Sequence, residues 1–298
     1  MTIDDAPPDV RSDGDVAAFY DARVAGKLAD FVRANPRVEA AIETIAAWSP
    51  RVPRRVLEVG CGIGATSWRM ARAWSSAEVI GVDLSAASTE AARACFRRPN
   101  LAYRTGRLAD CALDGVFDLV VMMDVYEHIA PRERGALQAE LRRLLSEEAR
   151  LVVTVPSPAH QAFLKTHQPE GLQPIDEIVD LGEIASLADA TATRVLAYRE
   201  VGVWRYGDYL HAVLGRGENL RPVARRNSGG PFQQLKAAAK AVLGHATDTP
   251  PAFHDHLGPD VATPRRGDPA RRLRVSTRER RGGAAAKRLA ASPRDETR

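Results

Sequence analysis

The sequence predicts an α/β fold, built on a mostly parallel sheet with helices on both faces. From Arg54 onward, short apolar runs typical of strands alternate with stretches typical of helices. One run, residues 117–123, is strongly apolar, as expected for a strand buried on both faces. The closing pair of strands, residues 194–201 and 206–214, has a link too short for a parallel crossover. The last strand is therefore expected to be antiparallel.

The first 52 residues are expected to form an arm and a helical cap. Residues 1–14 are predicted to be a disordered arm, and their acidic start without an apolar stretch is unlike a signal peptide. Apolar residues spaced by three or four then predict a helix that ends at Asn35-Pro36 and a second helix that ends near Trp48. These helices either pack on a core or form a lid over a substrate.

Residues 53–216 are predicted to carry the sheet. Strands are expected at residues 55–59, 78–82, 101–105, 117–123 and 151–155, before the closing pair. Helices are expected over residues 65–74, 85–96, 131–146 and 183–190. Ser85 is suited to cap the second of these helices, and Pro131 to the first turn of the third. Residues 157–178 are predicted to be a loop.

Residues 217–298 are predicted to be a basic, largely disordered tail, with a weak helix over residues 233–243. Residues 219–298 hold 17 Lys and Arg against 7 Asp and Glu, although the whole chain has a net charge of only +4. The rest of the chain is therefore acidic, and no nucleic-acid partner is expected. Three scattered cysteines fit a reducing cytoplasm, and no run reaches membrane-spanning length.

The stretch from Arg55 to Thr66 reads as a strand, a tight turn and the start of a helix. Gly60, Gly62 and Gly64 occupy every second position, and such a turn lets a ligand approach the backbone beside free helix N–H groups. A nucleotide-like cofactor is therefore expected there. The spacing also satisfies a dinucleotide pattern, but Glu58 just before the turn would repel a pyrophosphate and suits a cationic cofactor.

Further segments extend this pattern. Asp83 ends the second strand, Phe117-Asp118-Leu119-Val120 forms the fourth, and Glu127-His128-Ile129 follows it. Residues 150–156 read Arg-Leu-Val-Val-Thr-Val-Pro. Together these motifs, over about residues 54–156, resemble the class I S-adenosylmethionine (SAM)-dependent methyltransferases, particularly the branch of the ubiquinone-biosynthesis O-methyltransferases. The resemblance implies a Rossmann-like sheet with a reversed last strand, and SAM as methyl donor.

The resemblance also implies roles for matching residues. Glu58, Gly60, Gly62 and Gly64 would line the methionine end of the cofactor, and Asp83 would accept hydrogen bonds from the ribose. Where the family has an Asp that contacts adenine, this chain has Arg107, so that contact is assigned to Asp110, with a surface carboxylate as the alternative. Met123 and Asp124 would lie where cofactor and acceptor meet.

Proton removal from the acceptor is assigned first to His128, with Asp124 and His160 as further catalytic residues. The alternative is that His128 only holds its loop. Some relatives also bind a divalent cation near this motif, which implies Asp124, Glu127, His128 and His167 as ligands for an ion such as Mg²⁺, with His160 as another choice. The relatives usually have Glu where this chain has Asp124. The alternative is that Glu127 is a helix-start charge and both later histidines are loop residues.

The acceptor pocket is expected among the polar residues 160–176, after the fifth strand. The sequence thus predicts a cytoplasmic SAM-dependent methyltransferase that acts on a small polar molecule, at a hydroxyl of a specialised metabolite or sugar. An N-methyltransferase, an NAD-dependent oxidoreductase and a SAM-binding protein without catalysis are the alternatives.

Overall fold

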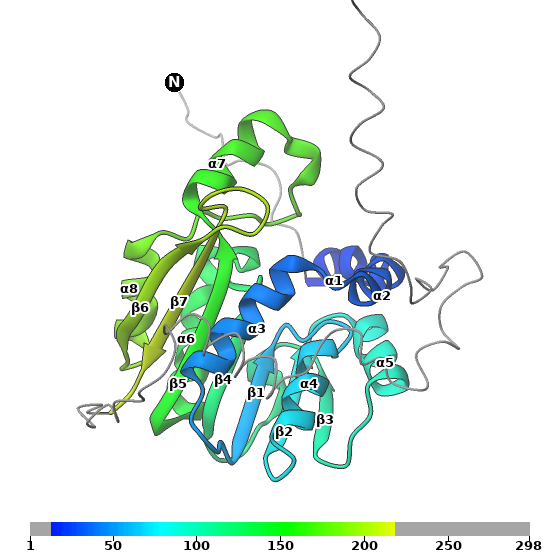
Figure 1. The fold of residues 1–298 in the computed structure, drawn as a ribbon, viewed down its shortest axis with the longest axis vertical. Helices are drawn as coiled ribbons and strands as arrows, with labels where there is room; N and C mark the ends of the chain where they lie inside the picture. The colour runs from blue at the N-terminus through cyan, green and yellow to red at the C-terminus, as the bar shows by residue number, and fades with distance from the viewer. Residues whose placement is uncertain (1–12, 218–298) are drawn as a thin grey trace, which may run out of the picture. The chain divides into compact units, whose positions relative to one another are not determined.

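The computed structural model describes residues 13–217, which fold around a seven-stranded sheet (Figure 1). The strands lie in the order β3-β2-β1-β4-β5-β7-β6. They are β1 (Arg55–Val59), β2 (Glu78–Asp83), β3 (Leu101–Thr105), β4 (Phe117–Met123), β5 (Leu145–Pro156), β6 (Arg194–Val201) and β7 (Tyr209–Gly215). Strands β1 to β5 are parallel, and β7 runs antiparallel to both β5 and β6. The predicted parallel sheet with an antiparallel last strand is therefore confirmed.

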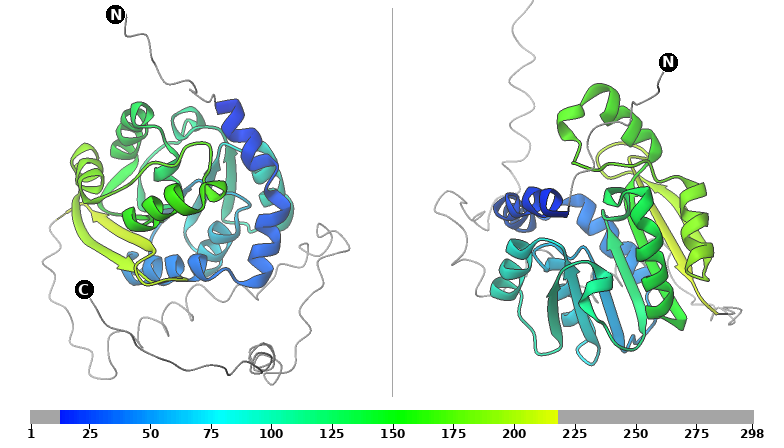
Figure 2. Two further views of the ribbon diagram at one scale, coloured as in Figure 1. Left: turned by 90° about the horizontal axis from the view of Figure 1, so that it is seen from above. Right: turned by 180° about the vertical axis from the view of Figure 1, so that it is seen from behind.

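Helices cover both faces of the sheet (Figure 2). They are α3 (Pro36–Trp48), α4 (Ala65–Ala73) and α5 (Ala86–Cys95) on one face, and α6 (Pro131–Leu144) and α8 (Leu181–Ala190) on the other. Successive residues of a strand point to opposite faces, so Val56 packs with Ile45 of α3 while Leu57 packs in the same core as Leu141 of α6. The sheet thus lies between two buried clusters, and a third cluster joins the cap helix residues Leu28 and Phe31 to Trp68 and Phe96.

The N-terminal cap is two helices rather than the single helix predicted before Asn35. α1 (Asp13–Asp21) and α2 (Val24–Arg33) are separated by a turn at residues 22–23. The reason is tertiary, because the Asp21 carboxylate accepts hydrogen bonds from the Ser85 hydroxyl (2.5 Å) and the Ala87 N–H (3.2 Å) at the start of α5. Phe31 of α2 packs edge-on against Phe96 after α5. The cap is thereby fixed beside the carboxyl ends of β1 and β2.

Besides small shifts of element ends, such as β7 beginning at Tyr209 rather than at residue 206, two other predictions differ from the structure. Residues 158–167, predicted to be loop, form helix α7 (Pro158–His167), which the Ser157 hydroxyl caps by accepting from the His160 N–H. Proline at the first helical position favours this start, because its missing N–H would have no partner there. β5 begins six residues earlier than predicted, at Leu145, because that residue already pairs with Phe117 across a register shift.

Three short 3₁₀ segments complete the described chain: η1 (Leu108–Cys111), η2 (Tyr126–His128) and η3 (Pro169–Gly171). The predicted tail and its helix over residues 233–243 lie outside the described residues, as does nearly all of the arm, and the domain limits at 53 and 216 stay predictions. Within residues 13–217, no helix combines the length and apolarity needed to cross a bilayer.

The turn into α4 yields a stability prediction. Gly64 has φ +81°, and a Cβ at this position would lie 2.5 Å from the Tyr103 hydroxyl oxygen. We expect Gly64→Ala to lower the free energy of unfolding by about 1–3 kcal/mol, measured by urea denaturation. Gly135→Ala, in the middle of α6, is the control, because a Cβ there meets nothing within 4 Å. This substitution should raise the free energy of unfolding by about 0.5–1 kcal/mol. Equal effects of the two substitutions would contradict the steric explanation.

Candidate functional site

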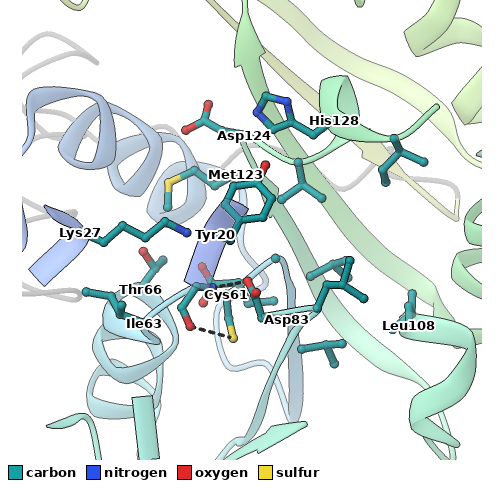
Figure 3. Close-up of a pocket in the computed structure, with 18 of the residues that line it drawn as sticks. Tyr20, Lys27, Cys61, Ile63, Thr66, Asp83, Leu108, Met123, Asp124 and His128 are labelled. Carbon is teal, nitrogen blue, oxygen red and sulfur yellow. Dashed lines mark hydrogen bonds between the residues drawn. The ribbon is translucent and has the colours of Figure 1, made fainter. Parts of the chain in front are cut away.

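A cavity of about 470 Å³ lies at the carboxyl ends of β1, β2 and β4 (Figure 3). This is a size typical of small-molecule sites, at the sheet edge where parallel folds bind ligands. Its walls come from the glycine turn after β1, from η1, from the loop after β4, and from α1 and α2. Figure 3 shows Asp83 and Leu108 on one side of the pocket, Asp124 and His128 on another, and Tyr20 and Lys27 reaching in from the cap.

The three glycines of the turn serve different purposes. A Cβ on Gly60 would lie 2.2 Å from the Val125 side chain, and Gly64 is closed off by Tyr103. Gly62 has φ +52°, and a Cβ there would point to the Lys27 ammonium, 3.3 Å away. Gly60 and Gly62 line the cavity, whereas Gly64 is not among its lining residues. The expectation that all three glycines line a cofactor site is therefore corrected: packing explains Gly64.

Asp83 holds the turn in place. Its Oδ2 accepts the Gly62 N–H at 2.6 Å, and its Oδ1 accepts the Ser85 N–H at 2.9 Å. Its carboxylate also lines the cavity. A carboxylate oxygen has more than one lone pair, so both oxygens retain capacity for a ligand's hydroxyl groups.

Glu58 lies beneath the turn and is fully buried. The Ser67 hydroxyl, one turn into α4, donates a hydrogen bond to its Oε2. Burial raises the pKa of Glu58 to about 8, although the bonds from Ser67 oppose the shift. At pH 7 this carboxyl is therefore mostly protonated, and a cation in the cavity would favour its ionised form.

The cap helices close the cavity from above. Tyr20 of α1 donates a hydrogen bond to Gln173 Oε1 at 2.7 Å, across 153 residues of chain. The Lys27 ammonium of α2 lies 4.8 Å from the centre of the Tyr20 ring. Of the two sequence interpretations of this segment, core helices or lid, the structure supports both: Leu28 and Phe31 are buried, while Tyr20 and Lys27 line the cavity.

The opposite end of the cavity holds buried carboxylates. Asp124 has φ +54° and pairs with Arg37 of α3 at 2.5 Å, through Oδ2. Its Oδ1 and both oxygens of Glu127 are buried without a hydrogen-bond partner in the described part of the chain. Burial raises the pKa of Asp124 and raises that of Glu127 well above its usual range. Of the two residues only Asp124 lines the cavity, so its Oδ1 favours a ligand that donates a hydrogen bond.

His128 is oriented by the loop after η3. Its Nδ1 lies 2.7 Å from the Ile175 carbonyl oxygen, which can only accept, so Nδ1 carries the proton. Burial lowers the pKa of the imidazole, so the ring is neutral at pH 7 and Nε2 keeps its lone pair. Asp176 Oδ1, 3.4 Å from Nδ1, lies on the same side as the carbonyl. The ring is thus a neutral base of fixed tautomer beside the cavity.

The structure brings most of the predicted site residues together. Those that line the cavity are Glu58, Gly60, Gly62, Asp83, Asp110, Met123, Asp124 and His128. His160 is not among the lining residues, because it lies in the first turn of α7 and faces the Tyr209 ring. The acceptor pocket expected within residues 160–176 is likewise not built by α7, and only Gln173 and Ile175 of that segment reach the cavity.

The predicted cation ligands are not assembled. No cluster of three or more His, Cys, Asp or Glu side chains suited to a metal ion occurs within residues 13–217. Asp124 is paired with Arg37, and His167 is exposed at the end of α7, where its ring stacks on Phe163. The expected ligand set Asp124, Glu127, His128 and His167 is therefore not brought together in the described residues, and His167 is carried away by helix α7, which the sequence did not predict.

The sequence did not indicate several polar residues of the cavity, among them Tyr20, Lys27 and Arg37. No sequence pattern assigned a role to Lys27 or Arg37, and Tyr20 was counted among the apolar positions of a helix. The spacing of Tyr20 did signal a helix, and the lid interpretation was open. No sequence signal indicated that Arg37 would pair with Asp124, 87 positions later, because only the tertiary fold brings α3 to the end of β4.

Comparison with known proteins gives a family match. Residues 56–148 match a family model described as a methyltransferase domain. The chain is 30% identical over 143 residues to a probable tocopherol O-methyltransferase of Oryza sativa, covering 45% of this chain and 39% of that protein. It is 38% identical over 96 residues to the mitochondrial ubiquinone biosynthesis O-methyltransferase of Candida albicans, covering 30% and 29%. The matched region thus spans well under half the length of these relatives.

Two further similarities extend over more of the chain. A trans-aconitate 2-methyltransferase of Methylobacterium nodulans is 25% identical over 203 residues, covering 63% of this chain and 77% of that protein. The solved magnesium protoporphyrin IX methyltransferase of Synechocystis, with bound SAM, is 18% identical, with a TM-score of 0.51 over 71% of this chain and 100% of that one. The predicted resemblance and the Rossmann-like fold are confirmed.

The buried Glu58 makes stability depend on pH. Its pKa is about 8 in the folded protein against 4.5 ordinarily, so between these values the folded state binds the extra proton. We therefore expect the free energy of unfolding to fall as the pH rises from 4.5 to 8, by on the order of 3 kcal/mol from this group. Glu58→Gln, which keeps the bond from Ser67, should be less sensitive to pH. The measurement is urea denaturation of both proteins at pH 5 and pH 8. An equal change in the free energy of unfolding for the wild type and Glu58→Gln would refute this prediction.

Proposed function

We propose that this chain, whose residues 56–148 form a class I SAM-dependent methyltransferase domain, transfers a methyl group from SAM to a small polar acceptor, at a hydroxyl oxygen. The observation that carries the proposal is the cavity itself. It joins the glycine turn and its carboxylates to a neutral histidine base within one enclosed space.

The residues around the turn fit SAM. Gly62 leaves its backbone open to a ligand, and Glu58 suits a cation better than a pyrophosphate. Asp83 would accept bonds from ribose hydroxyls, while Leu108 and Asp110 of η1 would flank adenine. When bound, SAM supplies a methyl group on a positively charged sulfur. The structural neighbour with bound SAM supports the same assignment.

The chain's own contribution is alignment, exclusion of water and proton removal. Met123 ends β4, Asp124 follows it, and both line the cavity. The acceptor hydroxyl would lie within reach of His128 Nε2, which takes its proton as the oxygen is methylated. Burial of the imidazole keeps Nε2 unprotonated at neutral pH. The buried Asp124 Oδ1 would accept a hydrogen bond from a second donor on the acceptor.

The acceptor end favours a hydrogen-bond donor over a carboxylate. Its cation, Arg37, is already paired with Asp124, and the buried Asp124 Oδ1 accepts a hydrogen bond more readily than it tolerates another anion. A tocopherol or ubiquinone O-methyltransferase fits this chemistry better than an enzyme that acts on trans-aconitate. An amine acceptor would meet the same oxygen, so N-methylation is the second candidate.

The remaining parts of the proposal follow from the sequence. We place the reaction in the cytoplasm, consistent with the free cysteines Cys61, Cys95 and Cys111, and assign no nucleic-acid partner. An NAD-dependent oxidoreductase and a SAM-binding protein without catalysis are the rival functions.

Cofactor identity can be tested by isothermal titration of the purified chain with S-adenosylhomocysteine and, separately, with NADH. We expect micromolar or tighter binding of S-adenosylhomocysteine and no heat from NADH, because Glu58 beside the turn favours a cation over a pyrophosphate. Binding of NADH alone would overturn the proposed function in favour of the oxidoreductase.

The role of His128 can be tested once labelled SAM has identified an acceptor among pooled hydroxylated compounds. We expect His128→Gln to lower kcat by about 10²- to 10⁴-fold, with the Kd for S-adenosylhomocysteine unchanged. In the wild type, kcat should fall in acid with a midpoint below 6.5, because burial lowers the pKa of His128. His160→Gln, outside the cavity, is the matched control. A normal kcat for His128→Gln would contradict the role of His128 as the base and leave alignment of the substrates as the source of catalysis.

A further inference from the structure

Lys27 places a positive charge inside the cavity without a counter-charge from the protein. No carboxylate lies within ion-pair distance of its ammonium in the described residues, where its close neighbour is the Tyr20 ring. The nearby Asp83 attracts it electrostatically, yet Gly62 and Ser85 already donate backbone bonds to that carboxylate. Burial lowers the pKa of Lys27, which is the cost of leaving an ammonium half-buried and unpaired.

The position of this ammonium limits what it can bind. It faces Gly62, the glycine of the turn whose missing side chain leaves space toward the cavity. α4 begins three residues later, at Ala65, and the first N–H groups of a helix also favour an anion. Figure 3 shows the Lys27 side chain extending over Ile63 and Thr66, at the start of α4, with its nitrogen directed into the pocket. An anionic group above Gly62 would therefore be paired from both sides.

We infer that Lys27 binds the α-carboxylate of the methionine part of SAM. This assignment rests on the proposed function, because it takes the ligand to be SAM. Glu58 and Lys27 then recognise opposite charges at the amino-acid end of SAM. The carboxylate of Glu58 would face its positive charge, and the ammonium of Lys27 would face its α-carboxylate. The positive partner comes from the cap rather than from the sheet domain, so cofactor binding also ties α2 to the glycine turn.

The test compares two ligands that differ in this end. S-adenosylhomocysteine carries the α-carboxylate, whereas 5′-methylthioadenosine keeps the adenosine and sulfur but lacks the amino-acid group. Isothermal titration would give the Kd of each ligand for the wild type and for Lys27→Met. We expect Lys27→Met to weaken S-adenosylhomocysteine about 10- to 100-fold and 5′-methylthioadenosine by less than about twofold.

Two variants serve as controls. Lys27→Arg keeps the charge and should retain most of the affinity for S-adenosylhomocysteine. Arg23→Met removes a positive charge from the same cap at an exposed position outside the cavity, and should change neither Kd. Binding of 5′-methylthioadenosine by Lys27→Met shows that the variant is folded; if that variant does not fold, Lys27→Gln replaces it.

The outcomes separate the two levels of the proposal. If Lys27→Met binds both ligands as the wild type does, or loses both equally, the carboxylate assignment is overturned while SAM binding stands. If Arg23→Met weakens S-adenosylhomocysteine as much as Lys27→Met does, the effect is general electrostatics and the assignment is also overturned. If the wild type binds NADH and neither adenosyl ligand, the proposed function fails first.

Discussion

The site depends on three backbone N–H groups of the glycine turn that the end of β2 holds in place. Gly60 and Cys61 donate to the Val82 carbonyl at 2.7 and 3.0 Å, and Gly62 donates to the Asp83 carboxylate at 2.6 Å. Without these bonds the turn would carry buried, unpaired donors, which is costly in a fold of marginal stability. Because the turn is fixed, Glu58 stays beneath it, α4 starts above it, and the open face of Gly62 points toward the cap. Asp83 thus builds the shape of the cavity besides lining it.

A second network joins the cap to the acceptor end. Tyr20 of α1 bonds Gln173, and the Gln173 N–H donates to Asp176 at 2.9 Å. Asp176 also accepts from Gln161 of α7 at 2.7 Å and lies beside His128, whose tautomer the neighbouring Ile175 carbonyl sets. Movement of α1 would therefore disturb the segment that orients the base. The position of the cap and the orientation of the His128 imidazole therefore depend on the same hydrogen bonds. This is expected where a lid completes a site.

The sheet could be predicted from the sequence because its signals are local. Apolar runs bounded by turn residues gave β1, β3, β4 and β6 with correct limits, and the glycine turn, Asp83 and His128 follow strand ends that converge at one edge. The rest depends on contacts between distant segments. Asp21 ends α1 only because α5 offers it donors, and Arg37 meets Asp124 only after α3 packs on the sheet. Residues 158–167 were predicted to be loop because proline was treated as a breaker, whereas at a helix start it is favoured.

Four ionisable side chains gather in or beside the cavity. Glu58, Asp124 and Glu127 are carboxyls whose pKa values burial raises, and Lys27 is an ammonium whose pKa burial lowers. Burial disfavours the charged form of each of these groups, and contacts such as the Asp124–Arg37 pair offset that cost only in part. Asp124 further adopts a left-handed backbone that side chains rarely occupy. A zwitterionic, sulfonium-bearing cofactor would meet Lys27 and Glu58 with opposite charges, and an acceptor rich in hydroxyl groups would satisfy Asp124. The unfavourable burial of charge thus lies where a ligand can compensate it. Ligand binding would recover this cost, and the free energy gained can help to align the groups for methyl transfer.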